Sequence, residues 1–350
     1  MRKHGLFGPG DRLIIGLSGG ADSVALTHLL PDVARAFDAA VVGLAHLNHQ
    51  LRPSAGEDEA FCRELAGEVG LPIDIDRVDV ASAARRARTS LEDAARVERY
   101  RFLRVAAVRA DATRVAVAHT RNDQAETVLL RLLRGAGPGG LAGILPRVDV
   151  VIRPLLDVTR AEVEAYLAAA HAPFREDPTN RDVSIPRNWV RHDVLPAMAE
   201  RCGAGIVDVL ARHAALARED AAWIEDLATE TTRSLVLEED GRITIERRPL
   251  LDLPVALARR VVRAAAQRAA GGRFVGFDHV ETILDLARNT QPSQVVDLPG
   301  QRVRSDGTWL VFIHTVPDAG RDGRRRGRPH MSEIAPPGVT AKTNPAPATK

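Results

Sequence analysis

The residues best suited to chemistry form a short polar loop near the N-terminus. Ser18-Gly19-Gly20-Ala21-Asp22-Ser23 follows an apolar run and precedes a helix-like segment. The two glycines permit a tight turn whose N–H groups converge, and the helix dipole adds positive potential there. Ser18 and Ser23 add hydroxyl donors. We interpret the hexapeptide as a phosphate-binding loop, and the alternative is a glycine-rich turn without a ligand. The GxxxxGK[ST] pattern is absent.

A second polar group is His46-Leu47-Asn48-His49, which follows another strand-like run. Two histidines three residues apart are compatible with a metal site, but no third ligand is evident. The segment lies where a doubly wound fold opens to its ligand. We therefore favour nucleotide or substrate contact and count His46 among the ATP-binding candidates.

The third group begins with His119 and continues to Thr127, again between a strand-like and a helix-like segment. Asp123 and Glu126 fall one helical turn apart. A carboxylate beside a triphosphate suits Mg²⁺, so Asp22 and Asp123 are the candidate metal ligands. A helix cap at Asp123 is the structural alternative. Arg134, at the end of this helix, precedes a glycine-rich run that is either a lid or a connector.

Further along, a turn-forming cluster at 177–182 leads to Arg187-Asn188-Trp189-Val190-Arg191. A polar turn followed by arginines fits either a solvated surface or a nucleic-acid contact. We take Arg187, Asn188 and Arg191 as candidate nucleic-acid contacts.

The elements that must position these groups alternate in the first half of the chain. Strands are predicted at 13–17, 41–45, 72–78 and 115–118, and helices at 23–36, 57–70, 91–109 and 123–134. The alternation predicts an α/β fold, a doubly wound, Rossmann-like parallel sheet covered on both faces. Ligands of such sheets bind at the carboxyl ends of the strands, where all three groups fall.

The second half has a different pattern. A long helix or two joined helices are predicted over 206–232, then a strand at 242–246, helices at 254–270 and 277–288, and three short strands between 295 and 313. We predict one domain over 1–213 and a smaller α+β domain over 214–316. Residues 317–350 are rich in Pro, Gly and Arg, which predicts a disordered basic tail.

Composition excludes several classes of protein. Only two cysteines are present, so neither a disulfide framework nor a CxxC site can form. No segment is apolar enough for a secretion signal or a membrane span, and we expect a cytoplasmic protein without a membrane partner. The net charge is +2, of which seven Lys/Arg and three Asp/Glu after position 316 contribute +4. The remainder is −2, so a nucleic-acid site must be a local patch.

Taken in order, these segments resemble the tRNA(Ile)-lysidine synthase family of PP-loop ATP pyrophosphatases. The family carries SGGxDS, H-x-[ND]-H-x-LR, a Ser-x-Glu…Arg-Tyr element, HxxDDQxET, RPLL and DP[ST]N…RNxxR. Their counterparts here are 18–23, 46–52, 90–100, 119–141, 153–156 and 177–191. The resemblance covers about residues 11 to 200. The family usually has two adjacent aspartates before the glutamine, whereas here the first is Asn122.

The resemblance implies an ATP-dependent ligase with an adenylation domain over 1–213 and a tRNA-recognition domain over 214–316. It also implies that the nucleic acid at Arg187, Asn188 and Arg191 is a tRNA. ATP binds on 18–23 with Mg²⁺ on Asp22 or Asp123, and the wobble cytidine of a tRNA(Ile) with a CAU anticodon is adenylated. The amine of free L-lysine then attacks C2 and AMP leaves. Catalytic candidates are Asp22, Asp123, His119 and Arg134, with Asp123 and His119 both open as the base. A homodimer is one assembly that the sequence allows.

Three alternative functions fit parts of this sequence. A tRNA cytidine thiolase of the same superfamily needs an iron–sulfur cluster, which two cysteines do not support. GMP or NAD synthesis is disfavoured by the arginine-rich element and the C-terminal domain. A non-catalytic RNA-binding protein on the same scaffold is the alternative from another class, and Asn122 is the residue that favours it.

Overall fold

The computed structural model describes residues 1–51, 55–239, 241–289, 291 and 293–315. The chain divides into two compact units, Met1–Leu227 and Ala228–Lys350. The dividing point lies within helix α10 (Ile206–Leu235), further along the chain than the predicted boundary at 213. The predicted disordered tail at 317–350 lies outside the described residues.

The first unit is built on a six-stranded sheet in the order β3-β2-β1-β4-β6-β5. All neighbouring strands pair in parallel except β5 with β6. The strands are β1 (Arg12–Gly16), β2 (Ala40–Asn48), β3 (Ile73–Arg77), β4 (Arg114–Ala116), β5 (Arg147–Val148) and β6 (Val151–Ile152). The predicted doubly wound sheet is thereby confirmed.

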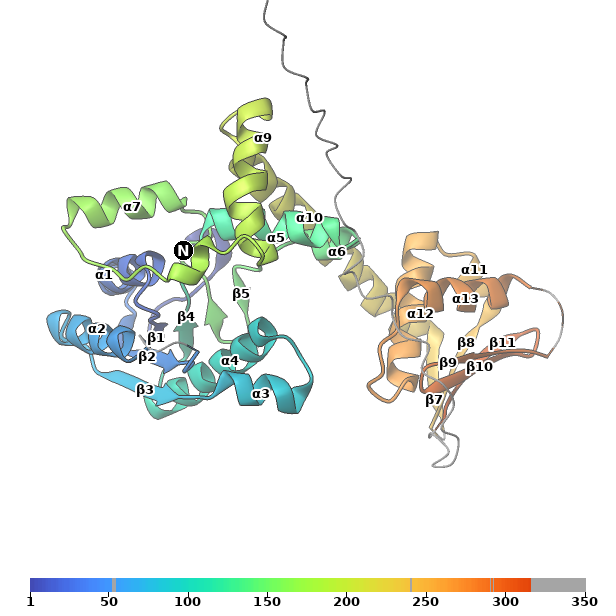
Figure 1. Cartoon of the computed structure of the whole chain (residues 1–350). Coiled ribbons are helices and arrows are strands. Elements are labelled where there is room, and N and C mark those ends of the chain that lie inside the picture. Colours follow the sequence, from blue (N-terminus) through green and yellow to red (C-terminus); the bar gives the residue numbers. More distant parts are fainter. Residues whose placement is uncertain (52–54, 240, 290, 292, 316–350) are drawn as a thin grey trace, which may run out of the picture. The chain divides into compact units, whose positions relative to one another are not determined.

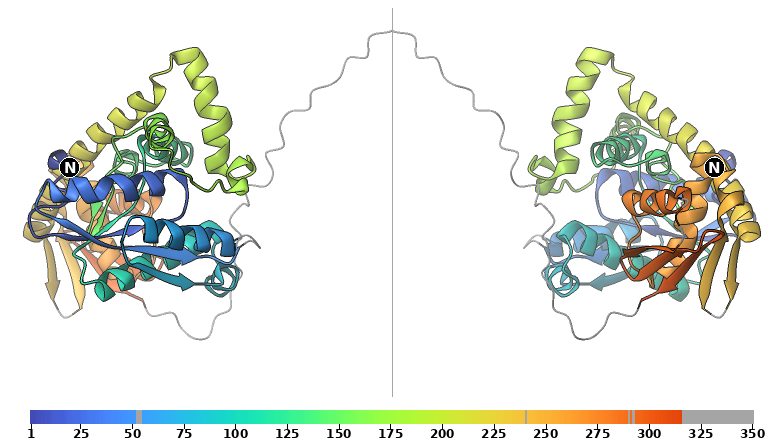
Figure 2. Two further views of the ribbon diagram at one scale, coloured as in Figure 1. Left: turned by 90° about the vertical axis from the view of Figure 1, so that its left-hand side faces the viewer. Right: turned by 90° about the vertical axis from the view of Figure 1, so that its right-hand side faces the viewer.

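Helices cover both faces of this sheet (Figure 1). Those in the first unit are α1 (Ala21–Arg35), α2 (Ala55–Glu68), α3 (Val80–Ala87), α4 (Leu91–Arg109), α5 (Arg121–Leu133), α6 (Pro138–Leu141), α7 (Arg160–Ala169), α8 (Pro186–Trp189) and α9 (Leu195–Cys202). One π-helical turn, Val190–Val194, joins α8 to α9. Figure 2 shows α1 and α2 over the same face of the sheet.

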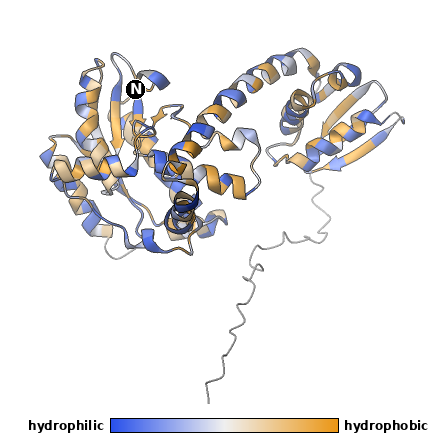
Figure 3. Cartoon of the chain, turned by 90° about the horizontal axis from the view of Figure 1, so that it is seen from above, coloured by the Kyte–Doolittle hydropathy of each residue, from blue (hydrophilic) through white to orange (hydrophobic). Residues whose placement is uncertain are grey.

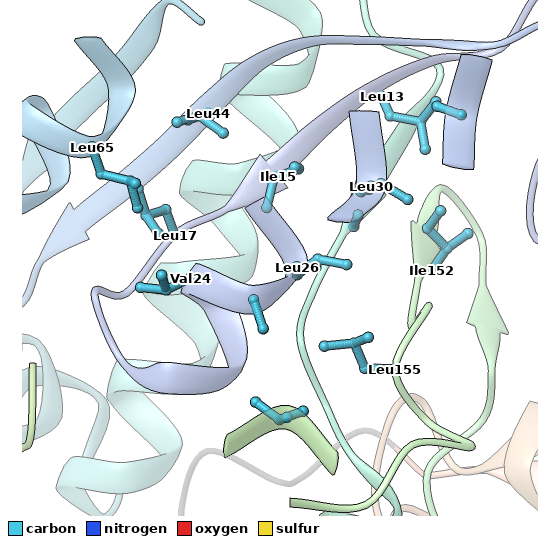
Figure 4. Packing of buried hydrophobic residues seen from close by; sticks show 14 of the residues in the cluster. Leu13, Ile15, Leu17, Val24, Leu26, Leu30, Leu44, Leu65, Ile152 and Leu155 are labelled. Carbon is cyan, nitrogen blue, oxygen red and sulfur yellow. The ribbon is translucent and has the colours of Figure 1, made fainter. Parts of the chain in front are cut away.

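Side-chain alternation along β1 explains the two-sided burial. Leu13 and Ile15 point to one face and pack with Val24 and Leu30 of α1, as Figure 4 shows. Ile14 points to the other face and packs with Phe102 of α4. Because the strand is buried on both faces, it reads as a continuous apolar run. The switch in strand order falls between β1 and β4. This places the phosphate-binding loop at 18–23, called the PP-loop below, beside the His119 segment.

The second unit has an antiparallel sheet in the order β7-β8-β11-β10-β9. Its strands are β7 (Val236–Glu239), β8 (Arg242–Glu246), β9 (Gln294–Leu298), β10 (Gln301–Ser305) and β11 (Trp309–His314). Helices α11 (Arg247–Leu251), α12 (Val255–Ala269) and α13 (Phe277–Arg288) pack on one face. Figure 3 shows hydrophobic and hydrophilic sides on helices of both units. Within the described residues no helix is long and apolar enough to cross a membrane.

Candidate active site

The PP-loop joins β1 to α1, and hydrogen bonds from its own serine side chains fix its conformation. Gly19 adopts φ +84°, a conformation that side-chain-bearing residues rarely take. The Ser18 N–H donates to Ser23 Oγ over 3.1 Å, and Ser23 Oγ donates to the Gly20 carbonyl over 2.9 Å. Gly20 is the N-cap of α1 and has no side chain to cap it. The first N–H groups of α1 therefore remain available to an anion.

A segment far along the chain supports this loop from outside. The Arg175 N–H donates to the Gly19 carbonyl over 2.9 Å. The guanidinium of Arg175 is 2.6 Å from Glu57 and 3.2 Å from Asp58 on α2. Arg175 could not be predicted as a site residue, because no sequence pattern distinguishes a lone arginine after a Pro-Phe pair. Its contacts fix the position of the Gly19 carbonyl and use none of the loop's N–H groups.

Asp22 lies in the first turn of α1, and only one of its oxygens has a partner. Oδ2 is 2.7 Å from Arg160 Nη1. Oδ1 is buried and has no hydrogen-bond partner among the described residues. Burial raises the pKa of Asp22 to about 6, and the nearby Asp123 adds to this, although Arg160 opposes it. An incompletely compensated carboxylate of this kind is suited to bind a cation.

His46 lies beneath the loop, near the end of β2. Its Nδ1 is 2.9 Å from the Leu17 carbonyl and 3.3 Å from Cys62 Sγ. A carbonyl only accepts, so Nδ1 carries the proton. Burial lowers the pKa of His46, and burial also raises the pKa of Cys62 to about 12. Both groups are neutral near pH 7, and His46 supports the backbone of the loop from below.

Asn48, in the same segment as His46, makes structural contacts. Asn48 donates to the Ala55 carbonyl and to Glu59 Oε2 over 3.0 and 3.2 Å. Glu59 in turn binds Arg63 and Arg77. Among the described residues, no group of three or more His, Cys, Asp or Glu could hold a metal. These contacts favour the nucleotide-side role of this segment over a histidine metal site.

The start of α5 is fixed by a reciprocal cap. Thr120 is the N-cap, and its N–H donates to Asp123 Oδ2 over 2.7 Å. Asp123 Oδ1 is 2.9 Å from Arg187. Burial alone would raise the pKa of Asp123, but Arg187 and the other neighbouring positive charges and donors hold it below its usual range. Asp123 therefore stays ionised, and it combines the capping role with a place beside Asp22.

Asn122 connects this helix to α7. Its Oδ1 accepts the backbone N–H of Arg160 over 2.9 Å. Arg160 is the first residue of α7, where Thr159 and Glu162 form a capping box. The amide oxygen thus places the residue whose guanidinium binds Asp22. The Thr159-x-x-Glu162 spacing was the sequence signal that could have located this helix start.

Glu126 is fully buried, and two arginines neutralise it. Its oxygens are 2.7 Å from Arg187 Nε and 2.6 Å from Arg191 Nε. Arg187 comes from α8 and Arg191 from the π-helical turn. Asn188, between them, is buried and donates to the carbonyls of Thr179 and Asp182. Asn188 thus anchors the polar turn, while the two arginines belong to the site's charge network.

His119 lies at the same edge but remains neutral. Burial lowers its pKa to about 3, since desolvation outweighs the attraction of Asp123. Its Nδ1 has no hydrogen-bond partner among the described residues. A neutral imidazole with a free nitrogen can accept or donate one hydrogen bond to a substrate.

These contacts assemble a charge-balanced network around the strand ends. It consists of the carboxylates of Asp22, Asp123 and Glu126 and the guanidinium groups of Arg160, Arg187 and Arg191. Arg134 is not part of it. Arg134 is exposed at the opposite end of α5, about 16 Å from Asp123 at the rise of an α-helix.

This chain is similar to known proteins over most of its length. The PP-loop domain family matches residues 6–198. The tRNA(Ile)-lysidine synthase of Symbiobacterium thermophilum is 43% identical over 97% of this chain and 72% of its own length. The tRNA(Ile)-lysidine synthase of Leifsonia xyli is 36% identical over 90% of this chain and 93% of its own length. The chain belongs to the tRNA(Ile)-lysidine synthase family. The match at 6–198 spans the loop at 18–23, the second polar segment and the α5 cap.

Among solved structures, the U34-tRNA thiolase NcsA from Methanococcus maripaludis with its [4Fe-4S] cluster is similar in fold. It has a TM-score of 0.52 and 16% identity, and the match covers 62% of this chain and 76% of that chain. This likeness concerns the PP-loop fold alone. Of the two cysteines here, Cys62 is buried and Cys202 is exposed on another element, so they hold no cluster together. Membership in the lysidine synthase family disfavours the thiolase alternative.

Proposed function

We propose that the chain joins lysine to the wobble cytidine of a tRNA(Ile) with a CAU anticodon at the expense of ATP. The cytidine O2 attacks the α-phosphorus and pyrophosphate leaves. The lysine ε-amine then attacks C2, the C2–O bond breaks, AMP leaves with that oxygen, and the amine loses a proton. Family membership supports the reaction, and the PP-loop geometry with its free helix N-terminus is the observation that carries it.

The network positions charge for both steps. The α1 N-terminus offers N–H groups to the phosphates, and Arg187 and Arg191 offer guanidinium groups nearby. Electrostatic stabilisation of this kind commonly contributes more than any other effect to the acceleration of such displacements. His119 and Asp123 are the candidates for receiving the amine proton. We propose to separate them by the pH dependence of the rate in His119→Gln and Asp123→Asn.

Mg²⁺ fits one position in this site. The unpartnered, buried Oδ1 of Asp22 lacks a positive partner, and a cation would supply it. Asp123 would have to exchange its contact with Arg187 to join the same ion. Asp22 would hold the ion, which when bound would neutralise charge on the triphosphate. Arg160 would then release Asp22 Oδ2 or share it.

The deciding experiment follows pyrophosphate release and labelled lysine together. The full chain is mixed with ATP, Mg²⁺, lysine and a tRNA(Ile) transcript with a CAU anticodon. We expect pyrophosphate, AMP and lysine-bearing tRNA in equal amounts, and none with a transcript whose anticodon begins with another base. tRNA binding without pyrophosphate release would instead support a non-catalytic RNA-binding protein. Cytoplasmic location, a homodimer and tRNA contact by Arg187, Asn188 and Arg191 stay predictions.

A further inference from the structure

The second unit contains a local concentration of positive charge. Between Pro254 and Phe277 the sequence has five arginines and no aspartate or glutamate. This segment comprises α12 and the loop that leads to α13, which pack on one side of their sheet (Figure 1). Since the whole chain carries a net charge of only +2, the segment stands out from its surroundings.

Two phenylalanines lie exposed in the same place. The exposed fractions of Phe274 and Phe277 are 72% and 64%. The other six phenylalanines of the chain are buried or partly buried. Val275, between them, is 2% exposed and holds the loop to the core, so the exposure of Phe274 does not come from a detached loop. Exposing two large aromatic groups together is unfavourable unless something binds them.

Phe277 contacts Arg259, and Arg263 lies on the same face of α12 as Arg259. The guanidinium carbon of Arg259 is 5.3 Å from the ring centroid of Phe277, and Glu281 orients that guanidinium over 2.7 Å. The Phe274 ring folds against the backbone of Gly276, where a Cβ would approach it to 3.0 Å. Arg263 follows Arg259 by one helical turn and is exposed; no described carboxylate forms an ion pair with it. We call Phe274, Phe277, Arg259 and Arg263 the aromatic–arginine platform.

We propose that the platform binds unpaired nucleotides of an RNA, with a base stacked on the phenylalanines and a phosphate held by Arg263. Exposed aromatic side chains beside arginines are the combination that binds single-stranded nucleic acid irrespective of sequence. A second copy of this chain is disfavoured, because a two-fold contact would place the arginines of both copies opposite one another. That the RNA is a tRNA rests on the proposed function.

The test measures affinity and its salt dependence separately. Binding of the full chain to the tRNA transcript is followed by fluorescence anisotropy for wild type, F274A/F277A, R263Q and the control Val295→Ala. Val295 is 48% exposed on β9 of the same unit. Each lost stack should weaken binding about 5-fold to 150-fold, with an unchanged slope of log K against log salt. R263Q should lower the magnitude of that slope by about one. Val295→Ala should change neither the affinity nor the slope.

A second variant covers the case in which F274A/F277A fails to fold. Phe277→Trp keeps a stacking surface, and its indole fluorescence should be quenched on RNA binding beyond any change in wild type. Wild-type affinity in a folded F274A/F277A, or no added quenching in Phe277→Trp, overturns the platform. An equal loss of affinity for a fully paired RNA duplex also overturns it. If wild type binds no tRNA at all, the proposed function fails. If wild type binds tRNA and the variants bind it equally well, only the platform fails.

Discussion

Replacing Asp22 by asparagine should make the protein more stable and less active. Asp22 is 23% exposed, Oδ1 has no partner among the described residues, and the pKa of its carboxyl is raised to about 6. Its folded-state pKa lies above the ordinary value of 3.8, so the folded state holds the proton more tightly. The stability that this proton provides is complete below pH 3.8 and is lost as the pH rises through 6.

The size of the effect follows from the two pKa values. The gap between 3.8 and about 6 corresponds to about 3 kcal/mol of unfolding free energy above pH 7. D22N removes the ionisation and should recover this amount at pH 8. At pH 5 the gain should be about half as large, since the wild-type carboxyl is then mostly protonated when folded. For a domain of this size, about 3 kcal/mol raises Tm by about 6–12 °C.

Thermal unfolding followed by circular dichroism at pH 5 and pH 8, in EDTA, checks the prediction. Asp32→Asn is the matched control, because Asp32 lies on the same helix with its side chain 80% exposed. The control should change stability by less than about 0.5 kcal/mol. Adding Mg²⁺ should raise Tm for wild type and leave D22N unchanged. A D22N variant that unfolds at or below the wild-type temperature at pH 8 would refute the reasoning.

Three other substitutions test the remaining contacts. Gly19→Ala should lose about 1–2 kcal/mol from its φ of +84° and at least tenfold in pyrophosphate release, while full activity would show the loop does not need that conformation. Glu126→Gln should cost about 3–5 kcal/mol by leaving two arginines uncompensated, measured by urea unfolding; a loss under about 1 kcal/mol would contradict a structural role. Asn122→Asp should keep the bond to Arg160 and lower the Mg²⁺ concentration for half-maximal rate, whereas inactivity would show that Asn122 is required.

The sequence predicted much of the framework because local patterns determine it. The apolar run at 13–17 became β1, and the helix predicted over 91–109 became α4 with Ser90 as its N-cap. Several elements had no such pattern. The alanine-rich α3 and the two-residue strands β5 and β6 were not predicted, since their length or composition gives no periodicity.

The site was predictable only where its residues belong to one loop. The PP-loop and the Asp123 segment could be read directly, since each joins a strand to a helix. Arg160 and Arg175 were missed because their partners lie more than a hundred positions away in the chain. Asn188 was predicted to contact tRNA; its side chain is buried and anchors the adjacent turn. Such contacts depend on tertiary packing, which no short window of sequence contains.

The attachment of the PP-loop to Arg175 has a consequence for how the protein folds. The loop itself is synthesised early, but the residue that fixes its backbone follows only after about 150 further positions, and Arg187 and Arg191 come later still. Closing contacts of such sequence separation is entropically slow. A nascent chain can therefore form β1 and α1 long before it can bind a nucleotide. ATP binding becomes a property of the completed first unit, and nucleotide-dependent protection from proteolysis should appear only once residues up to 191 have left the ribosome.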